Sequence, residues 1–157
     1  DEKLFEILHY DFFNIQPIDI AKASIAVNKA NFNEKVDKTS LRRYIAELRE
    51  PKQPGLFDAV DRPEMKRLIE DIEYLLKAAS SLTLQQLFQA IITKMGILTY
   101  IMKQPDKGWY MQILTNFFNF LKDENRKNPE LKVAEFIELI DLMKKNNISI
   151  SFNQHIF

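Results

Sequence analysis

Few residues in this 157-residue chain could do chemistry. It has no cysteine and two histidines, His9 and His155, which lie near opposite ends. Thiol chemistry, disulfides and cysteine-rich zinc sites are therefore excluded, and histidine-dependent catalysis is poorly supplied. His9 lies next to acidic residues and could act as a general base, but a partly buried or hinge histidine is the favoured interpretation.

Carboxylates gather in two places, at residues 70–73 and at Asp123 and Glu124. Such groups can hold magnesium or act as acid and base. Here they alternate with lysine and arginine at helical spacing, which is typical of a solvated helix face. The chain also has no glycine-rich phosphate loop ending in Lys-Ser or Lys-Thr. We therefore expect no catalytic residue, no metal site and no cofactor within this chain.

One group of basic residues could bind phosphate. Lys35, Lys38, Arg42 and Arg43 surround the expected start of a helix, where backbone N–H groups favour anions. Ordinary surface charge is the favoured interpretation of this group. Because 22 basic residues balance 22 acidic ones, no global field draws the chain to nucleic acid, and any such contact must use a local patch.

The elements that would position these residues are helices. Apolar residues recur at three- and four-residue steps, which predicts an all-α fold, a compact bundle of about seven helices forming a single domain over residues 1–157. The expected helical stretches are 1–10, 18–30, 41–49, 63–80, 84–95, 97–103, 109–127 and 132–146. Residues 148–152 alternate apolar and polar side chains and are predicted to form a short C-terminal extended segment.

Local signals predict where several helices begin and end. Pro17 suits the first position of the second helix. Thr39 or Ser40 can cap the third, and Thr83 can open a capping box. Gly96 suits a left-handed helix end.

Two further expectations concern packing. The apolar stripe of residues 18–30 is expected to comprise Ile18, Ala21 and Ile25, widened by Ile20 and Val27. Leu56 and Phe57 are expected to fold back onto the core, and Asp61 is a candidate cap.

The aromatic residues, 12 Phe, 5 Tyr and one Trp, are expected mostly in the core. Phe12 and Phe13 are the exceptions, because they are consecutive residues of a turn.

The composition also bears on location. No apolar run approaches the roughly 20 residues that span a bilayer, and there is no signal peptide. We expect no membrane contact and a cytoplasmic location. The start at Asp1 and the apolar end suggest a fragment of a longer protein.

The order and spacing of these helical patterns resemble the helical 2B subdomain of UvrD/PcrA/Rep-like superfamily 1 DNA helicases. The resemblance covers nearly the whole chain. It begins at LFEILHY and continues through SLRRYIAEL, LIEDIEYLLKAASSLTLQQLFQAIITKMGILTYI, ILTNFFNFLKD and VAEFIELIDLM. In that family the chain then returns to the second motor subdomain near a Ser-Lys-Gly-Leu-Glu motif.

The resemblance implies a function. The 2B subdomain contacts duplex DNA through a Gly-Ile-Gly turn and modulates unwinding, while ATP and magnesium belong to the parent helicase. The turn falls on residues 14–17 of this chain, where Ile15 matches and Asn14 and Gln16 replace the glycines. Asn14 is expected to keep the turn, since asparagine tolerates positive φ. Gln16 and Lys22 are expected to supply side-chain contacts to DNA.

The resemblance therefore predicts a non-catalytic helicase subdomain whose partners are duplex DNA, bound weakly, and the motor subdomains of the parent helicase. Its candidate DNA-binding residues are Asn14, Ile15, Gln16, Lys22, Arg42 and Arg43. The alternative is a stand-alone helical protein-interaction module that uses Phe12 and Phe13 as anchors.

Overall fold

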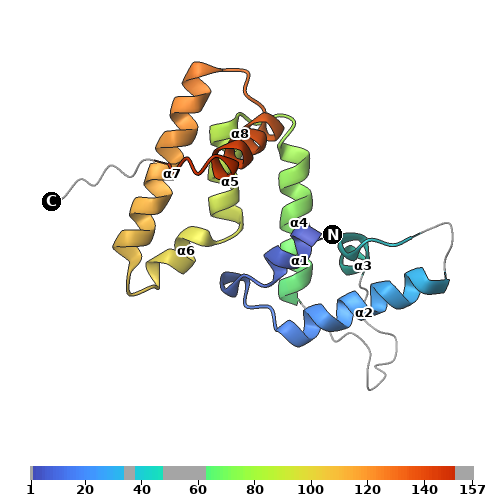
Figure 1. Ribbon diagram of the computed structural model, residues 1–157. Coiled ribbons are helices and arrows are strands. Elements are labelled where there is room, and N and C mark those ends of the chain that lie inside the picture. The colour runs from blue at the N-terminus through green and yellow to red at the C-terminus, as the bar shows by residue number, and fades with distance from the viewer. Residues whose placement is uncertain (1, 34–37, 48–62, 151–157) are drawn as a thin grey trace. The chain divides into compact units, whose positions relative to one another are not determined.

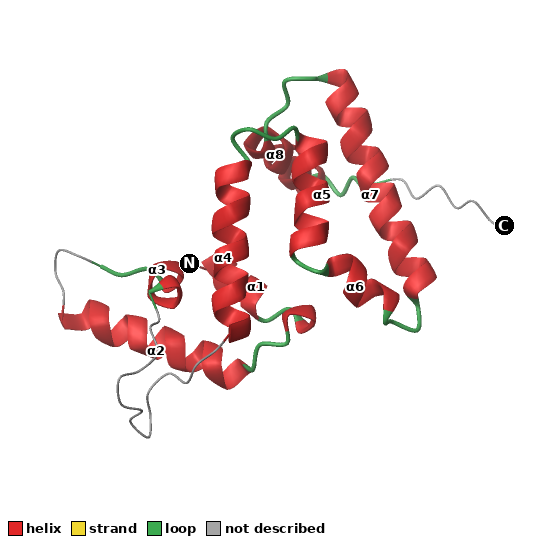
Figure 2. Ribbon diagram, turned by 180° about the vertical axis from the view of Figure 1, so that it is seen from behind, coloured by secondary structure: helices red, strands yellow, loops and turns green. Residues whose placement is uncertain are grey.

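The computed structural model describes residues 2–33, 38–47 and 63–150, and within these ranges the chain is helical (Figures 1 and 2). The elements are α1 (Glu2–Leu8), η1 (Asp11–Phe13), α2 (Pro17–Asn33), α3 (Leu41–Ala46), α4 (Pro63–Ala78), α5 (Leu84–Lys94), α6 (Ile97–Met102), α7 (Lys107–Lys127) and α8 (Val133–Lys145). Among the described residues there is no strand, so the all-α fold class is confirmed. None of the described helices is long and apolar enough to cross a bilayer.

Internal contacts divide the chain into two compact units, residues 1–74 and 75–157. The single domain inferred from the sequence stays a prediction. In the first unit, α3 packs against α2 and α1. Buried apolar side chains come from all four of its helices: Leu8, Ile20, Ala23, Val27, Leu41, Ile45, Met65, Leu68 and Ile69.

The second unit is built on α5, α6 and α7, each of which contacts the other two. Its core centres on Leu84, Leu121 and Phe136, so α8 joins α5 and α7 there. Phenylalanines of α5 and α7 surround this centre, with Phe88 and Phe117 ring centroids 5.3 Å apart. Most of the cohesion of this unit comes from burial of these large apolar side chains.

Local chemistry places the helix ends where the sequence predicts them. Ser40 Oγ accepts a hydrogen bond from the Arg43 N–H at 3.1 Å. Thr83 Oγ1 accepts from the Gln86 N–H, and the Thr83 N–H donates to Gln86 Oε1, which completes the predicted capping box. Gly96 has φ 66°, the left-handed conformation expected at a helix end, and α6 begins at the next residue.

The predicted centre of the apolar stripe of α2, at Ile18, Ala21 and Ile25, is wrong, whereas Ile20 and Val27, expected to widen the stripe, are buried. Ile20, Ala23 and Val27 are the buried residues, whereas Ile18 and Ile25 are exposed. The reason is that apolar residues occur all around this helix, so periodicity alone cannot select the face that packs. The helix also runs three residues past its predicted end at residue 30.

The C-terminal extended segment is described only in part. Ile148, Ser149 and Ile150 form neither helix nor strand. Residues 151 and 152 lie outside the described residues, as do Lys35, Leu56, Phe57 and Asp61 and the expectations attached to them.

Candidate nucleic-acid interface

The turn between η1 and α2 is defined by one left-handed residue. Asn14 has φ 54° and ψ 34°, and its N–H donates to the Asp11 carbonyl at 3.0 Å. This confirms that Asn14 takes the conformation that glycine adopts most readily. Two residues later the Gln16 carbonyl accepts from the Asp19 N–H at 2.9 Å, and α2 begins at Pro17 as predicted.

The outer side of this turn carries groups that can meet a polar ligand. Asn14 and Gln16 are exposed, and their amides offer both donors and acceptors. Tyr10 and Ile18 flank them and are also exposed, with Ile18 at 60%. The sequence did not single out these two flanking residues. The sequence feature that could have identified them is their position, immediately before η1 and at the second residue of α2.

Aromatic side chains pack together beside the turn. The rings of Phe12 and Phe13 lie 4.3 Å apart, and the Tyr10 ring stacks on Phe12 at 5.7 Å. Both phenylalanines are half-buried, as is Ile15. The aromatic rings therefore pack against one another, whereas Asn14 and Gln16 are exposed.

Charge around the turn is low. Lys22 lies one helical turn after Ile18, on the same face of α2, and is half-buried. Asp19, in the first turn of α2, is only 5% exposed, and a carboxylate there already complements the positive end of the helix dipole. Hydrogen-bonding groups therefore outnumber cationic groups at this surface.

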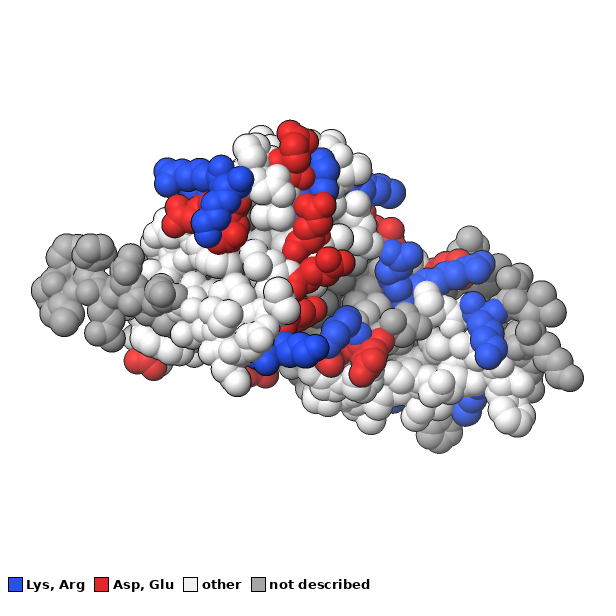
Figure 3. All heavy atoms as spheres, turned by 45° about the horizontal axis from the view of Figure 1, so that its top comes forward, with Lys and Arg blue, Asp and Glu red and all other residues white. Residues whose placement is uncertain are grey.

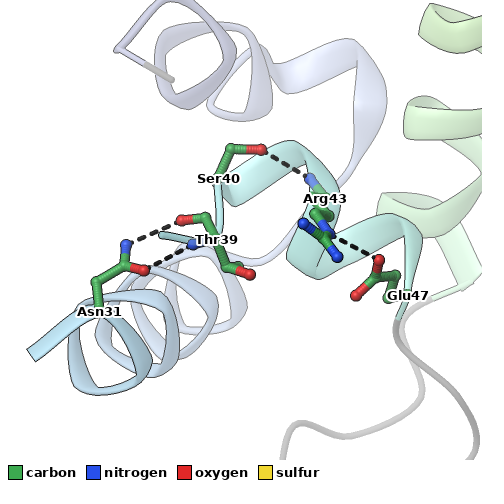
Figure 4. Close-up of polar contacts among 5 residues, drawn as sticks. All are labelled: Asn31, Thr39, Ser40, Arg43 and Glu47. Atoms are coloured by element: carbon green, nitrogen blue, oxygen red, sulfur yellow. Dashed lines mark hydrogen bonds and ion pairs between the residues drawn. The ribbon is translucent and has the colours of Figure 1, made fainter. Parts of the chain in front are cut away.

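The two candidate arginines lie on α3 and are ion-paired. Arg42 Nε is 3.3 Å from a Glu73 carboxylate oxygen, and Arg43 Nε is 2.9 Å from one of Glu47. The first turn of α3 is already capped by Ser40 (Figure 4). These carboxylates offset the positive charge that a phosphate site on α3 would need.

Two hydrogen bonds join the end of α2 to the segment that precedes α3 (Figure 4). The Asn31 amide donates to the Thr39 carbonyl at 2.9 Å, and the Thr39 N–H donates to Asn31 Oδ1 at 2.7 Å. Both bonds are partly shielded from water, so they are worth more than a fully exposed pair.

Four of the six candidate residues lie on one continuous stretch of the structure. Asn14, Ile15, Gln16 and Lys22 follow one another through the turn and the start of α2. Arg42 and Arg43 stand on another helix and face acidic partners.

Three of the other polar groups weighed in the sequence have structural partners. His9 Nδ1 is 2.8 Å from the Phe5 carbonyl. Asp123 pairs with Arg126 and Glu124 with Lys127, as expected for a solvated helix face. Over residues 2–33, 38–47 and 63–150, no cluster of His, Cys, Asp or Glu could hold a metal ion.

On the face drawn in Figure 3, the described basic and acidic side chains are interspersed rather than sorted into one broad basic surface. Nucleic-acid binding through this face would therefore depend on small local groups.

Comparisons with protein-family models, with curated proteins and with solved structures found no match.

Proposed function

We propose that this chain is a non-catalytic accessory subdomain of an ATP-dependent DNA helicase, which contacts duplex DNA and modulates unwinding by the motor subdomains. ATP and magnesium would bind elsewhere in the parent chain, in the cytoplasm. The observation that supports this best is the left-handed Asn14, because it preserves a glycine-like turn at the position where the resemblance places duplex contact.

The chemistry of the turn suits a DNA backbone. Amide side chains of asparagine and glutamine commonly donate to phosphate and sugar oxygens, and such contacts set position rather than sequence preference. Asn14 and Gln16 would supply these donors, and Lys22 would add one cation. With a single cation, binding would be weak and its affinity would fall only about as the first power of salt concentration.

The test is duplex binding by the 157-residue chain, followed by fluorescence anisotropy at low salt. A Gln16→Ala/Lys22→Ala variant should bind a labelled duplex roughly five- to 150-fold more weakly, since two contacts are lost and each is worth about 0.5–1.5 kcal/mol. A Gln89→Ala/Lys144→Ala variant, altered at exposed positions of the second unit, is the matched control. Equal affinities for the two variants and the wild-type chain would remove the turn from the DNA interface.

A protein-interaction module is the second candidate. Exposed apolar side chains on α2, at Ile18, Ile25 and Phe32, favour it. Binding to a protein partner together with no duplex affinity at low salt would support this function instead.

A further inference from the structure

Two exposed apolar surfaces of the second unit carry opposite charges. The first, named the α6–α7 corner, is the group of exposed residues on either side of the turn between these two helices: Leu98, Met102, Lys103, Lys107 and Trp109. Met102 and Trp109 flank the turn that joins the two helices, and Leu98 lies one helical turn before Met102. The Trp109 side chain is 59% exposed.

The second surface, named the α8 face, consists of Ile137, Glu138, Asp141 and Leu142. Its two apolar side chains are more than half exposed. Residues 138, 141 and 142 lie at helical three- and four-residue steps, so the carboxylates and Leu142 are neighbours on the surface.

The charged groups of both surfaces are available to a partner. Within the described residues, neither Lys103 nor Lys107 lies in an ion pair, and neither do Glu138 and Asp141. Other charged residues on these helices do form ion pairs, as Asp123 and Glu124 do at the end of α7.

Opposite charges are present near each surface, at Asp106 beside the corner and at Lys144 and Lys145 in the last turn of α8. The corner therefore has two positively charged lysines and one negatively charged aspartate. On α8 the acidic residues occupy the first two-thirds of the helix and the lysines its end.

The two surfaces lie at opposite ends of the second unit. The corner is at the start of α7, whereas α8 packs through Phe136 against Leu121, four turns further along α7. The 14 residue steps from Lys107 to Leu121 span about 21 Å of helix, so one molecule cannot bring its own corner onto its own α8 face. Both ribbon views agree on this arrangement within the unit (Figures 1 and 2).

We propose that the α6–α7 corner of one copy of this chain docks on the α8 face of a second copy. Lysines of the corner would meet the carboxylates of the face, and Trp109, Met102 and Leu98 would cover Ile137 and Leu142. Exposed tryptophan and methionine are the residue types enriched at such contacts. Because different surfaces meet, the contact is head-to-tail and extends into a ring or an open series.

The interface is small, which sets the expected strength. Contacts below about 1,200 Å² of buried surface form weak, transient complexes. Sedimentation velocity of the full 157-residue chain, over roughly 10–500 μM, should therefore show a sedimentation coefficient that rises with concentration and falls with added salt.

Charge reversal tests the pairing itself. Lys103→Glu/Lys107→Glu should weaken self-association at least tenfold, and so should Glu138→Lys/Asp141→Lys, because like charges then face each other. Combining all four changes in one chain should restore association, since the complementarity is rebuilt with opposite sign. Lys29→Glu/Lys66→Glu, at exposed positions of the first unit, is the control and should associate as the wild type does.

Several outcomes overturn the proposal. A wild-type chain that sediments as a monomer throughout the concentration range excludes the contact. So does a quadruple variant that stays as weak as either double variant while circular dichroism shows it folded. Equal weakening by the control would show that the effect is one of net charge alone.

Discussion

Replacing Asn14 by alanine should destabilise the first unit by about 1 kcal/mol, because an ordinary L-residue pays about 1–2 kcal/mol for the left-handed conformation and asparagine pays less. The Asn14 side chain is exposed, so no core packing is lost with it. The backbone bond from its N–H to Asp11 does not depend on the side chain. Asn14→Gly should be nearly neutral, since glycine adopts this φ freely and adds only unfolded-state entropy.

Asn147 provides the matched control. It has the same φ of 54°, is exposed, and ends α8 in the second unit, where the Ile148 N–H donates to the Met143 carbonyl. Asn147→Ala should therefore cost a similar amount, but from the second unit. Only the change at Asn14 should weaken duplex binding.

Amide hydrogen exchange read by mass spectrometry separates the two costs, because it reports opening free energies segment by segment. A loss of about 1 kcal/mol corresponds to roughly fivefold faster exchange. The faster exchange should fall in residues 2–33 for Asn14→Ala and around α8 for Asn147→Ala. Unchanged exchange at Asn14→Ala, or equal loss of duplex affinity from the two variants, would refute the reasoning.

Three further predictions concern stability. Asn31→Ala should lower the opening free energy of α3, measured by hydrogen exchange, by about 1–2 kcal/mol, because two partly shielded hydrogen bonds to Thr39 are lost. Asn28→Ala, on the exposed side of α2, is the control and should stabilise slightly. Thr83→Ala should cost about 1 kcal/mol by removing the cap of α5, measured as a lower urea midpoint for the second unit. Leu121→Ala should cost about 2–5 kcal/mol in the same assay, because this side chain is 1% exposed in the core of the second unit; an equal cost from Leu142→Ala, which is exposed, would contradict that account.

The sequence predicts those features that depend on a few neighbouring residues. Pro17 sets the start of α2, and Thr83 and Gln86 cap each other, because these effects need only adjacent backbone. Asn14 likewise follows from the conformational tolerance of asparagine.

Features that depend on distant partners are predicted less well. Ile18 and Ile25 lie on a helical face as apolar as that of Ile20 and Val27, and packing against distant elements such as α3 selects between the two faces. Trp109 similarly lies on an apolar stripe of α7 and yet is exposed.

The candidate site shows the same division. The turn residues Asn14 and Gln16 are exposed, as their place between two helices suggested. The ion pairs of Arg42 and Arg43 were not predicted. Arg42 reaches Glu73, 31 residues further along the chain, and no local pattern identifies that partner.

Gly96 joins α5 to α6 through one left-handed residue, and a Cβ added there would meet no atom within 4 Å. The position is therefore constrained by backbone conformation alone and not by space. In evolutionary terms it should accept asparagine before any other residue, while β-branched residues should be rejected. The residue types found at position 96 in related sequences would therefore reflect the free-energy cost of the left-handed conformation alone. At most glycines, close packing also restricts the residue type.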